Sequence, residues 1–422
     1  MTLSAPSPEH AATWCIAALA TAGVIVRPWR LPEAVWAVGG AALLVVAGLV
    51  PPDRAWSAVG RGVDVYLFLA GMMVLAEVAR HEGLFDWLAV FAVRHARGSA
   101  RRLFALVYAI GTAVTVLMSN DATAVVLTPA VCAVVRRAGA RALPYLLVCA
   151  FIANAASFVL PISNPANLVV FGDRLPDLGH WLARFTLPSL VAIAATYAVL
   201  VHRHRDDLRA PIVGDLPATP LGPGGRLAAA GIGMVAAVLL AASALGRPLG
   251  APTLVASALV AAAIAWRTRT APWAALHGVA WSVLLLVAGL FVLVEGLVRS
   301  GVVQALVEAL HAAAAQAPTA TAWGVGLLVA FACNALNNLP AGLLAGSVMQ
   351  QAAVPASIQS AIAIGIDLGP NLSVTGSLAT ILWLIAIRRE GVSISAGAFL
   401  REGAVVMPVA LVLALAALLL PA

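Results

Sequence analysis

An all-α polytopic membrane protein is the fold class that this sequence predicts, on the basis of its composition and the length of its apolar runs. Of its 422 residues, 62% are hydrophobic and 10% are charged, and the mean hydropathy is +0.98. Soluble domains are about half apolar and about a quarter charged. The apolar runs have the length of membrane helices, and they lack the ten-residue alternation of outer-membrane barrel strands.

The charged residues lie mainly in short connections between the apolar runs. The formal net charge of +7 comes from arginine, because the chain contains no lysine. This placement indicates how the chain is oriented in the lipid bilayer rather than an affinity for nucleic acid, so no nucleic-acid partner is expected.

The four cysteines are scattered without paired spacing, which argues against disulfides and zinc sites. We expect neither a metal nor a cofactor.

An internal duplication is visible at a constant offset. LAGMMVLAEVARHEGLFDWL aligns with VAGLFVLVEGLVRSGVVQAL, so that Gly71 corresponds to Gly289 and Glu77 to Glu295. We expect the two glycines to mark close helix packing and the two glutamates to have a structural role near the membrane edge. The same offset places MSNDATAVV over LNNLPAGLL, which indicates two related halves. We predict a first repeat at 1–205, a cytoplasmic linker at 206–224 and a second repeat at 225–422.

Matching loops of the two halves differ in charge. Residues 94–102 carry four arginines and their counterpart 312–320 carries none; likewise 136–141 is basic and 354–359 is neutral. The positive-inside rule places the basic loops in the cytoplasm and the neutral loops outside. The repeats are therefore predicted to be inverted in the inner (plasma) membrane, with both termini on the external (periplasmic) side.

The segment between the two basic loops of the first half must return to the side from which it enters. Residues 103–135 form a mainly apolar stretch with a polar cluster at Ser119 to Thr123, where a carboxylate would be costly in lipid. We predict a re-entrant hairpin with its tip at this cluster, because irregular backbone at membrane depth must be buried in protein or line a cavity. Residues 321–353 would form the second hairpin, with its tip at Asn337 to Pro340.

Five transmembrane spans per repeat account for the other long apolar runs. The fourth span of each repeat is broken by Pro and Gly, at 161–167 and 369–377, because these residues disrupt helical hydrogen bonding. Inverted repeats with polar helix breaks describe the midplane site of a secondary transporter. The predicted spans are 11–29, 33–50, 63–80, 143–171 and 182–202, then 227–245, 252–266, 278–298, 355–387 and 396–420, with short interfacial helices at 84–93 and 302–314.

Three segments carry a resemblance to a known family: SNDATAVVLTP, NALNNLPAGLLAG and IDLGPNLSVTGSLATILW. They are similar to signature segments of the arsenite efflux permeases, within the ion transporter superfamily of antiporters and dicarboxylate symporters. The resemblance implies export of arsenite or antimonite by alternating access, driven by exchange for protons or, in some systems, by a cytoplasmic ATPase subunit. One departure is Asn154, where that family often has an aspartate, so this chain has one fewer titratable group for proton coupling.

The residues at the tips and breaks suit such a substrate. Arsenous acid is a neutral trihydroxy species, and amide and hydroxyl side chains can both donate hydrogen bonds to it and accept them. Proton exchange needs carboxyl groups that change protonation state, for which Asp121 and Asp367 are the candidates. The predicted substrate-binding residues are Ser119, Asn120, Thr123, Asn164, Asn167, Asn337, Asn338, Ser377 and Thr380.

Other interpretations of these residues stay open. Asp121 can instead cap a helix, and Ser163, Asn164 and Asn167 can simply hold helices together by hydrogen bonds. A sodium/proton antiporter or a dicarboxylate transporter of the same superfamily would use similar tips. An enzyme is not expected, because the sequence has no HExxH, nucleophile-elbow or Walker motif.

Overall fold

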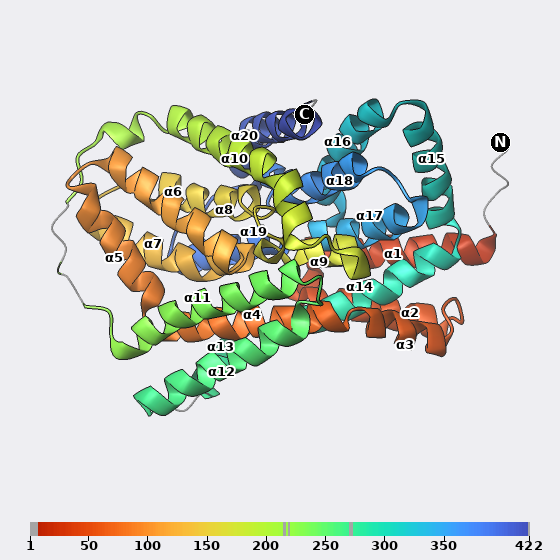
Figure 1. The fold of residues 1–422 in the computed structure, drawn as a ribbon, viewed down its shortest axis with the longest axis horizontal. Coiled ribbons are helices and arrows are strands. Elements are labelled where there is room, and N and C mark those ends of the chain that lie inside the picture. The colour runs from red at the N-terminus through yellow and green to blue at the C-terminus, as the bar shows by residue number, and fades with distance from the viewer. Residues whose placement is uncertain (1–6, 214–216, 218–219, 270–272, 421–422) are drawn as a thin grey trace.

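Helices make up the regular structure of the chain. The computed structural model describes residues 7–213, 217, 220–269 and 273–420, and Figure 1 shows most of the long helices running along the long axis of the molecule. Within these ranges, eight helices are long and apolar enough to cross a membrane. The predicted all-α polytopic membrane fold is confirmed.

The helices follow the predicted spans closely. In the first half they are α1 (Pro8–Val26), α2 (Glu33–Val46), α4 (Val63–His81), the broken pair α8 (Ala142–Ala155) and α9 (Pro165–Phe171), and α10 (Leu178–Arg203). In the second half they are α11 (Pro223–Ala244), α12 (Gly250–Thr268), α14 (Ser282–Arg299), the broken pair α18 (Ala356–Leu368) and α19 (Leu378–Arg389), and α20 (Ala396–Leu419). Helices α5 (Leu84–Ala96) and α15 (Val302–Gln316) occupy the positions of the predicted interfacial helices.

The first predicted hairpin folds back on itself. The hydroxyl of Thr123 lies 2.8 Å from that of Thr115 and 3.4 Å from the carbonyl oxygen of Gly111. A Cβ added to Gly111 would lie 3.8 Å from a methyl group of Leu127, whereas in one continuous helix these two residues would be about 24 Å apart. The entering arm is α6 (Ala100–Leu117), and the returning arm is the π-helical turn η2 (Ala122–Leu127) followed by α7 (Thr128–Arg137).

The second hairpin consists of α16 (Pro318–Leu336) and α17 (Asn338–Ala352), which pack against each other. The chain turns between them at Asn337, whose φ of 71° lies in a region that few residues other than glycine adopt. Asparagine tolerates this conformation, and here its side-chain oxygen accepts a hydrogen bond from the backbone N–H of Leu339 at 3.3 Å. The tip therefore falls where the sequence predicted it.

The two broken helices lie at the centre of the molecule. Every residue of α8 from Pro144 to Ala155 is buried, and so is every residue of α18 from Ser360 to Leu368. A helix that is buried all round belongs to the core of a bundle. At the breaks, short 3-10 turns η3 (Pro161–Ser163) and η6 (Gly369–Leu372) replace the α-helix.

Helices from the two halves pack in a reciprocal way. Helix α4 packs on α12, and the repeat-related α14 packs on α2. A Cβ on Gly71 would lie 2.8 Å from the backbone of Thr253, and a Cβ on Gly289 would lie 2.6 Å from the backbone of Ala37. The predicted close packing at both glycines is thus confirmed. Reciprocal contacts of this kind are what a two-fold relation between halves requires, although the repeat boundaries and their inversion stay predictions.

Helix α3 (Pro52–Arg61) was not predicted. It is short and amphipathic, with only Ala58 buried, and it joins α4 at a bend of 48°. A search for long apolar runs overlooks this helix because most of its residues are polar or exposed.

The predicted linker at 206–224 lies partly outside the described residues. The remaining short elements are η1 (Pro28–Arg30), η4 (Gly172–Arg174), η5 (Asp207–Arg209) and α13 (Trp273–Gly278).

Candidate binding site at the helix breaks

The predicted site residues of the first hairpin tip have different surroundings. The hydroxyl of Ser119 accepts a hydrogen bond from the backbone N–H of Ala122 at 3.3 Å, so Ser119 supports the turn itself. The hydroxyl of Thr123 is turned inward, toward Thr115. The side-chain oxygen of Asn120 is buried without a hydrogen-bond partner in the described part of the chain. At this tip, Asn120 therefore retains an acceptor for a ligand.

Asp121 does not cap a helix. Its side chain makes no capping hydrogen bond at the start of η2, so that interpretation is wrong. Asp121 instead lines a cavity of about 110 Å³ together with Ser119, Pro165 and Leu378. Pro165 and Leu378 are the first residues of α9 and α19, so the cavity joins the first tip to the N-terminal ends of both half-helices.

Glu77 lies on the wall of the same cavity. Its carboxylate accepts two hydrogen bonds from the guanidinium of Arg80, one of them at 3.0 Å. The repeat-related Glu295 pairs with Arg61 at 2.6 Å. Both glutamates are therefore held by arginine, as a structural role predicts.

The second hairpin tip is bonded to the break in the fourth span of its own half. The side-chain amide of Asn337 donates to the carbonyl oxygen of Thr375 at 3.2 Å, and the backbone N–H of Asn338 donates to that of Gly376 at 2.9 Å. The side-chain oxygen of Asn338 is buried and has no hydrogen-bond partner among the described residues. Asn338 thus matches its repeat counterpart Asn120.

Each half-helix that follows a break is capped by a predicted site residue. The side-chain oxygen of Asn164 accepts from the backbone N–H of Ala166 at 2.9 Å at the start of α9. The hydroxyl of Ser377 accepts from the backbone N–H of Thr380 at 3.0 Å at the start of α19, and it lies 2.8 Å from the Thr380 hydroxyl. These N-termini bring partial positive charge to the centre of the protein.

Hydrogen bonds join the two breaks across the halves. The amide of Asn164 donates to the carboxylate of Asp367. The amide of Asn154 donates to the side-chain oxygen of Asn371 at 3.0 Å and to the hydroxyl of Thr380 at 3.4 Å. Most of the predicted break residues therefore belong to one polar cluster that both halves build.

Asn167 is placed differently from the other predicted residues. Its amide donates to the carbonyl oxygen of Ser157 at 3.0 Å and to that of Pro161 at 3.5 Å. Ser163 similarly bonds the carbonyl oxygen of Val116 at 3.1 Å. These two side chains hold the irregular backbone of the first break, as the helix-joining interpretation predicts.

Unpartnered oxygens gather at the tips and breaks. Five buried side-chain oxygens there have no hydrogen-bond partner within the described ranges, and one of them belongs to the fully buried carboxylate of Asp367. An unsatisfied buried acceptor costs about 1–3 kcal/mol, so such a concentration of them calls for water or a ligand. The five unpartnered oxygens are Asn120 Oδ1, Asn154 Oδ1, Asn167 Oδ1, Asn338 Oδ1 and Asp367 Oδ2.

Sequence reasoning left out Asn371 and Asn154 of the central cluster and Thr115 of the first hairpin. Asn371, which accepts from Asn154 and donates to the carbonyl oxygen of Phe151 at 3.1 Å, lies inside the predicted break at 369–377 and could have been found there. Asn154 was noted only for departing from the family pattern. Thr115 is the partner of Thr123. Its role could not be predicted, because a single threonine within an apolar run does not indicate a hydrogen-bond partner.

Two hairpins and two broken helices around a buried polar cluster define a helical membrane transporter. A family model described as citrate transporter (CitMHS) matches residues 18–387, and the chain belongs to this family.

Similar proteins carry a more specific name. The chain is 30% identical over 413 residues to an arsenical pump membrane protein of Escherichia coli, covering 94% of this chain and 95% of that protein. It is 29% identical to an arsenical pump membrane protein of Yersinia enterocolitica, over 90% of this chain and 91% of that one. The resemblance to arsenite efflux permeases, predicted from three segments, is confirmed.

A solved structure shares the fold. The crystal structure of the Alcanivorax borkumensis YdaH transporter, whose title reports an unusual topology, is similar with a TM-score of 0.55 and 16% identity, and 86% of each chain is covered. At this identity the similarity concerns the fold alone.

Proposed function

We propose that the protein exports arsenite or antimonite across the inner membrane in exchange for protons, by alternating access around the helix breaks. The observation that carries the proposal is the set of unpartnered oxygens at the tips and breaks. The names of the similar arsenical pump membrane proteins support the same substrate.

The chemistry of these oxygens favours a ligand that donates hydrogen bonds. Arsenous acid and its antimony analogue are neutral at pH 7 and carry three O–H donors, which match free amide and carboxylate acceptors. Citrate, in contrast, presents carboxylates that would face the carboxylate of Asp367. Among the described residues that line the cavity beside Asp121, no arginine is present that could compensate such charges.

Asp121 and Asp367 are proposed to carry the protons. Asp121 lines a cavity, and its carboxylate makes no capping hydrogen bond at the start of η2, so it is proposed to exchange protons with water in that cavity. Asp367 is fully buried and bonded to Asn164, so a change in its protonation alters the bonding of the central cluster. Substrate would bind with Asp367 ionised, and protonation would then favour release.

A sodium/proton antiporter or a dicarboxylate transporter is the second candidate. The description of the matching family names citrate, and free oxygens also suit a sodium ion. Each candidate predicts a different transported species, so one assay can separate all three.

The test is uptake of radiolabelled arsenite into everted membrane vesicles with and without an interior-acid pH gradient. We expect uptake to need the gradient and to proceed without ATP, and an ATP requirement would instead favour a partner ATPase. Asp121→Asn and Asp367→Asn should each abolish the gradient-driven part, whereas Asp53→Asn, on the exposed face of α3, should not. Gradient-driven uptake of sodium or citrate without arsenite uptake would overturn the proposal.

A further inference from the structure

A second polar cavity lies far from the helix breaks, where α10 ends and α20 begins. Its volume is about 250 Å³, and the start of α8 forms its third side. None of the predicted transport residues is among the described residues that line it. The arginine-rich loops predict that this face is cytoplasmic, so the cavity would lie at the inner surface of the membrane.

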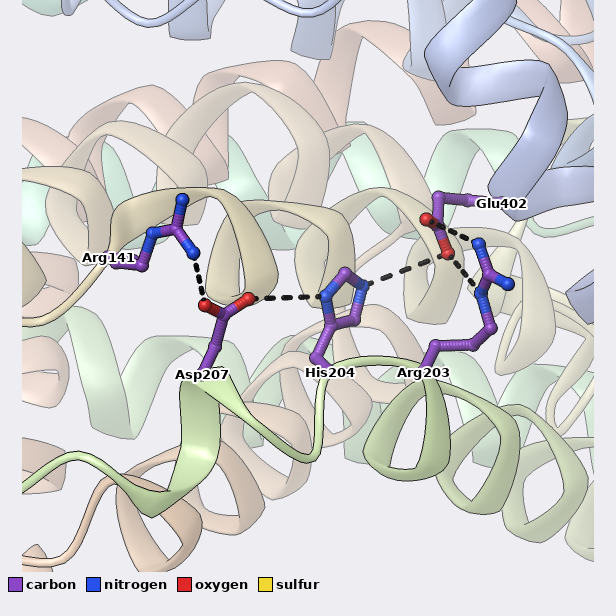
Figure 2. A network of polar contacts seen from close by, with 5 residues as sticks. All are labelled: Arg141, Arg203, His204, Asp207 and Glu402. Carbon is purple, nitrogen blue, oxygen red and sulfur yellow. Dashed lines mark hydrogen bonds and ion pairs between the residues drawn. The ribbon is translucent and has the colours of Figure 1, made fainter.

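One wall of this cavity carries an excess of positive charge. Arg203 donates two hydrogen bonds to Glu402, at 3.0 and 3.1 Å, and so neutralises it (Figure 2). Arg401 also lines the cavity, is exposed, and forms no ion pair or hydrogen bond within the described ranges. The guanidinium of Arg401 therefore remains available to an anion.

His204 provides a further polar group on the same wall. Figure 2 shows its ring between Asp207 and Glu402, with each ring nitrogen 3.8 Å from a carboxylate oxygen. Nε2 is buried and lacks a hydrogen-bond partner in the described part of the chain. Asp207 is itself paired with Arg141 at 2.6 Å, so it adds no uncompensated negative charge. An unpartnered ring nitrogen can bond an oxygen of a ligand.

The other wall of the cavity is apolar. Leu143 and Leu147 from α8 face Ile394 and Ala398, which lie just before and within α20. Leu147 and Ile394 are buried. A basic wall next to an apolar wall at the membrane surface suits a molecule that has an anionic headgroup and an acyl chain.

We propose that this cavity binds an anionic phospholipid, with its phosphate at Arg401 and His204 and the start of an acyl chain against Leu143 and Leu147. Free phosphate shares the headgroup chemistry, but it would leave the apolar wall without a partner. The inference does not depend on the transported species.

Native mass spectrometry of the purified full chain tests the proposal with three probes: phosphatidylglycerol, phosphatidylcholine and inorganic phosphate. We expect phosphatidylglycerol to be retained in preference to phosphatidylcholine, and millimolar phosphate not to displace it. Arg401→Gln should weaken retention about five-fold, the effect of one basic residue on anionic lipid binding. Arg205→Gln removes an exposed arginine that directly follows His204 but lies outside the cavity, and it should leave retention unchanged.

A second variant separates binding from folding. Ala398 is half-buried and lines the cavity. Ala398→Trp places a large side chain there, so it should abolish phosphatidylglycerol retention while leaving the unfolding temperature near that of the wild type in lipid-free detergent. Equal retention of both lipids, or equal effects of the Arg401 and Arg205 variants, would overturn the proposal. Displacement by inorganic phosphate would identify a site for a free anion and overturn the lipid assignment.

Discussion

The side-chain amide of Asn164 donates to the carboxylate of Asp367, although the two residues lie in different halves of the chain. Asn164 also caps α9, and Asp367 is the last polar residue of α18 before its break. One hydrogen bond therefore connects the ends of both broken helices. Because the second oxygen of Asp367 has no partner within the described ranges, any change in the charge of this carboxylate acts directly on the contact between the halves.

Asn164→Ala is expected to destabilise the protein by about 1–3 kcal/mol, because it leaves a buried carboxylate without its donor. The unfolding temperature in detergent measures this. Combining the change with Asp367→Asn should recover part of the loss, since a neutral amide is less costly to bury unpaired than a charge. Purely additive effects of the two changes would contradict a direct interaction.

The reciprocal glycines give a second prediction. Gly71→Ala and Gly289→Ala place a methyl group within 2.8 Å of the partner helix backbone, and overpacking of this kind costs about 1–3 kcal/mol. Gly233→Ala, in α11 with nothing within 4 Å, should be neutral or stabilising, because alanine favours helices over glycine by about 0.5–1 kcal/mol. Equal unfolding temperatures for all three variants would show that the helices do not approach as closely as described.

The fold was largely predictable because its main signals are local. Runs of apolar residues mark the spans, and arginine placement with the Ser119 to Thr123 cluster marks the first hairpin. Helix α3 was missed because exposed polar residues hide an amphipathic helix from an apolar-run criterion. The alignment of Gly71 with Gly289 predicted close packing at both glycines, but the helices that they contact became visible only in the structure.

The sequence predicted which residues lie at the site, but it did not predict what each side chain does there. Asn120 and Asn338 combine polarity with a break in an apolar run, and both retain free oxygens. Thr123 has the same sequence signal, yet its hydroxyl bonds Thr115 inside the hairpin. Only the direction in which a side chain points separates these cases, and that direction is set by tertiary packing.

A contact between α9 and α17 predicts how readily these two helices separate from each other locally. The amide of Gln350 donates to the carbonyl oxygen of Phe171 at 3.2 Å, and Arg174 donates to the backbone carbonyl of Gln350 at 2.8 Å. This contact lies beside a cavity of about 300 Å³ on the face predicted to be external. Gln350→Ala removes one hydrogen bond, so it should raise the population of the locally opened form about five-fold.

Hydrogen–deuterium exchange of backbone amides measures that opening. Faster exchange is expected in residues 165–174 and 343–352, with little change in α15. Gln304→Ala serves as the control, because it removes an exposed hydrogen bond to Glu308 within α15. If both variants gave the same exchange pattern, the α9–α17 contact would have no special role in opening.

His204, beyond the end of α10, predicts how stability depends on pH. Burial lowers the pKa of His204 below its ordinary value of 6.5, although Glu402 and Asp207 act in the opposite direction and Arg203 adds to the lowering. Between the lowered pKa and 6.5, the unfolded chain binds more protons than the folded one, so stability falls as the pH decreases through this window. Arg141 and Arg401, the nearby arginines, stay charged throughout.

The unfolding temperature in detergent should therefore drop between pH 7 and pH 5, and His204→Gln should remove the part of the drop that belongs to His204. The variant keeps a polar side chain but cannot take up the proton. His202→Gln, which changes an exposed histidine two residues earlier, should keep the full dependence. A steeper drop in the His204 variant than in the wild type would mean that the carboxylates of Glu402 and Asp207 outweigh burial, because a histidine with a raised pKa stabilises the protein at low pH.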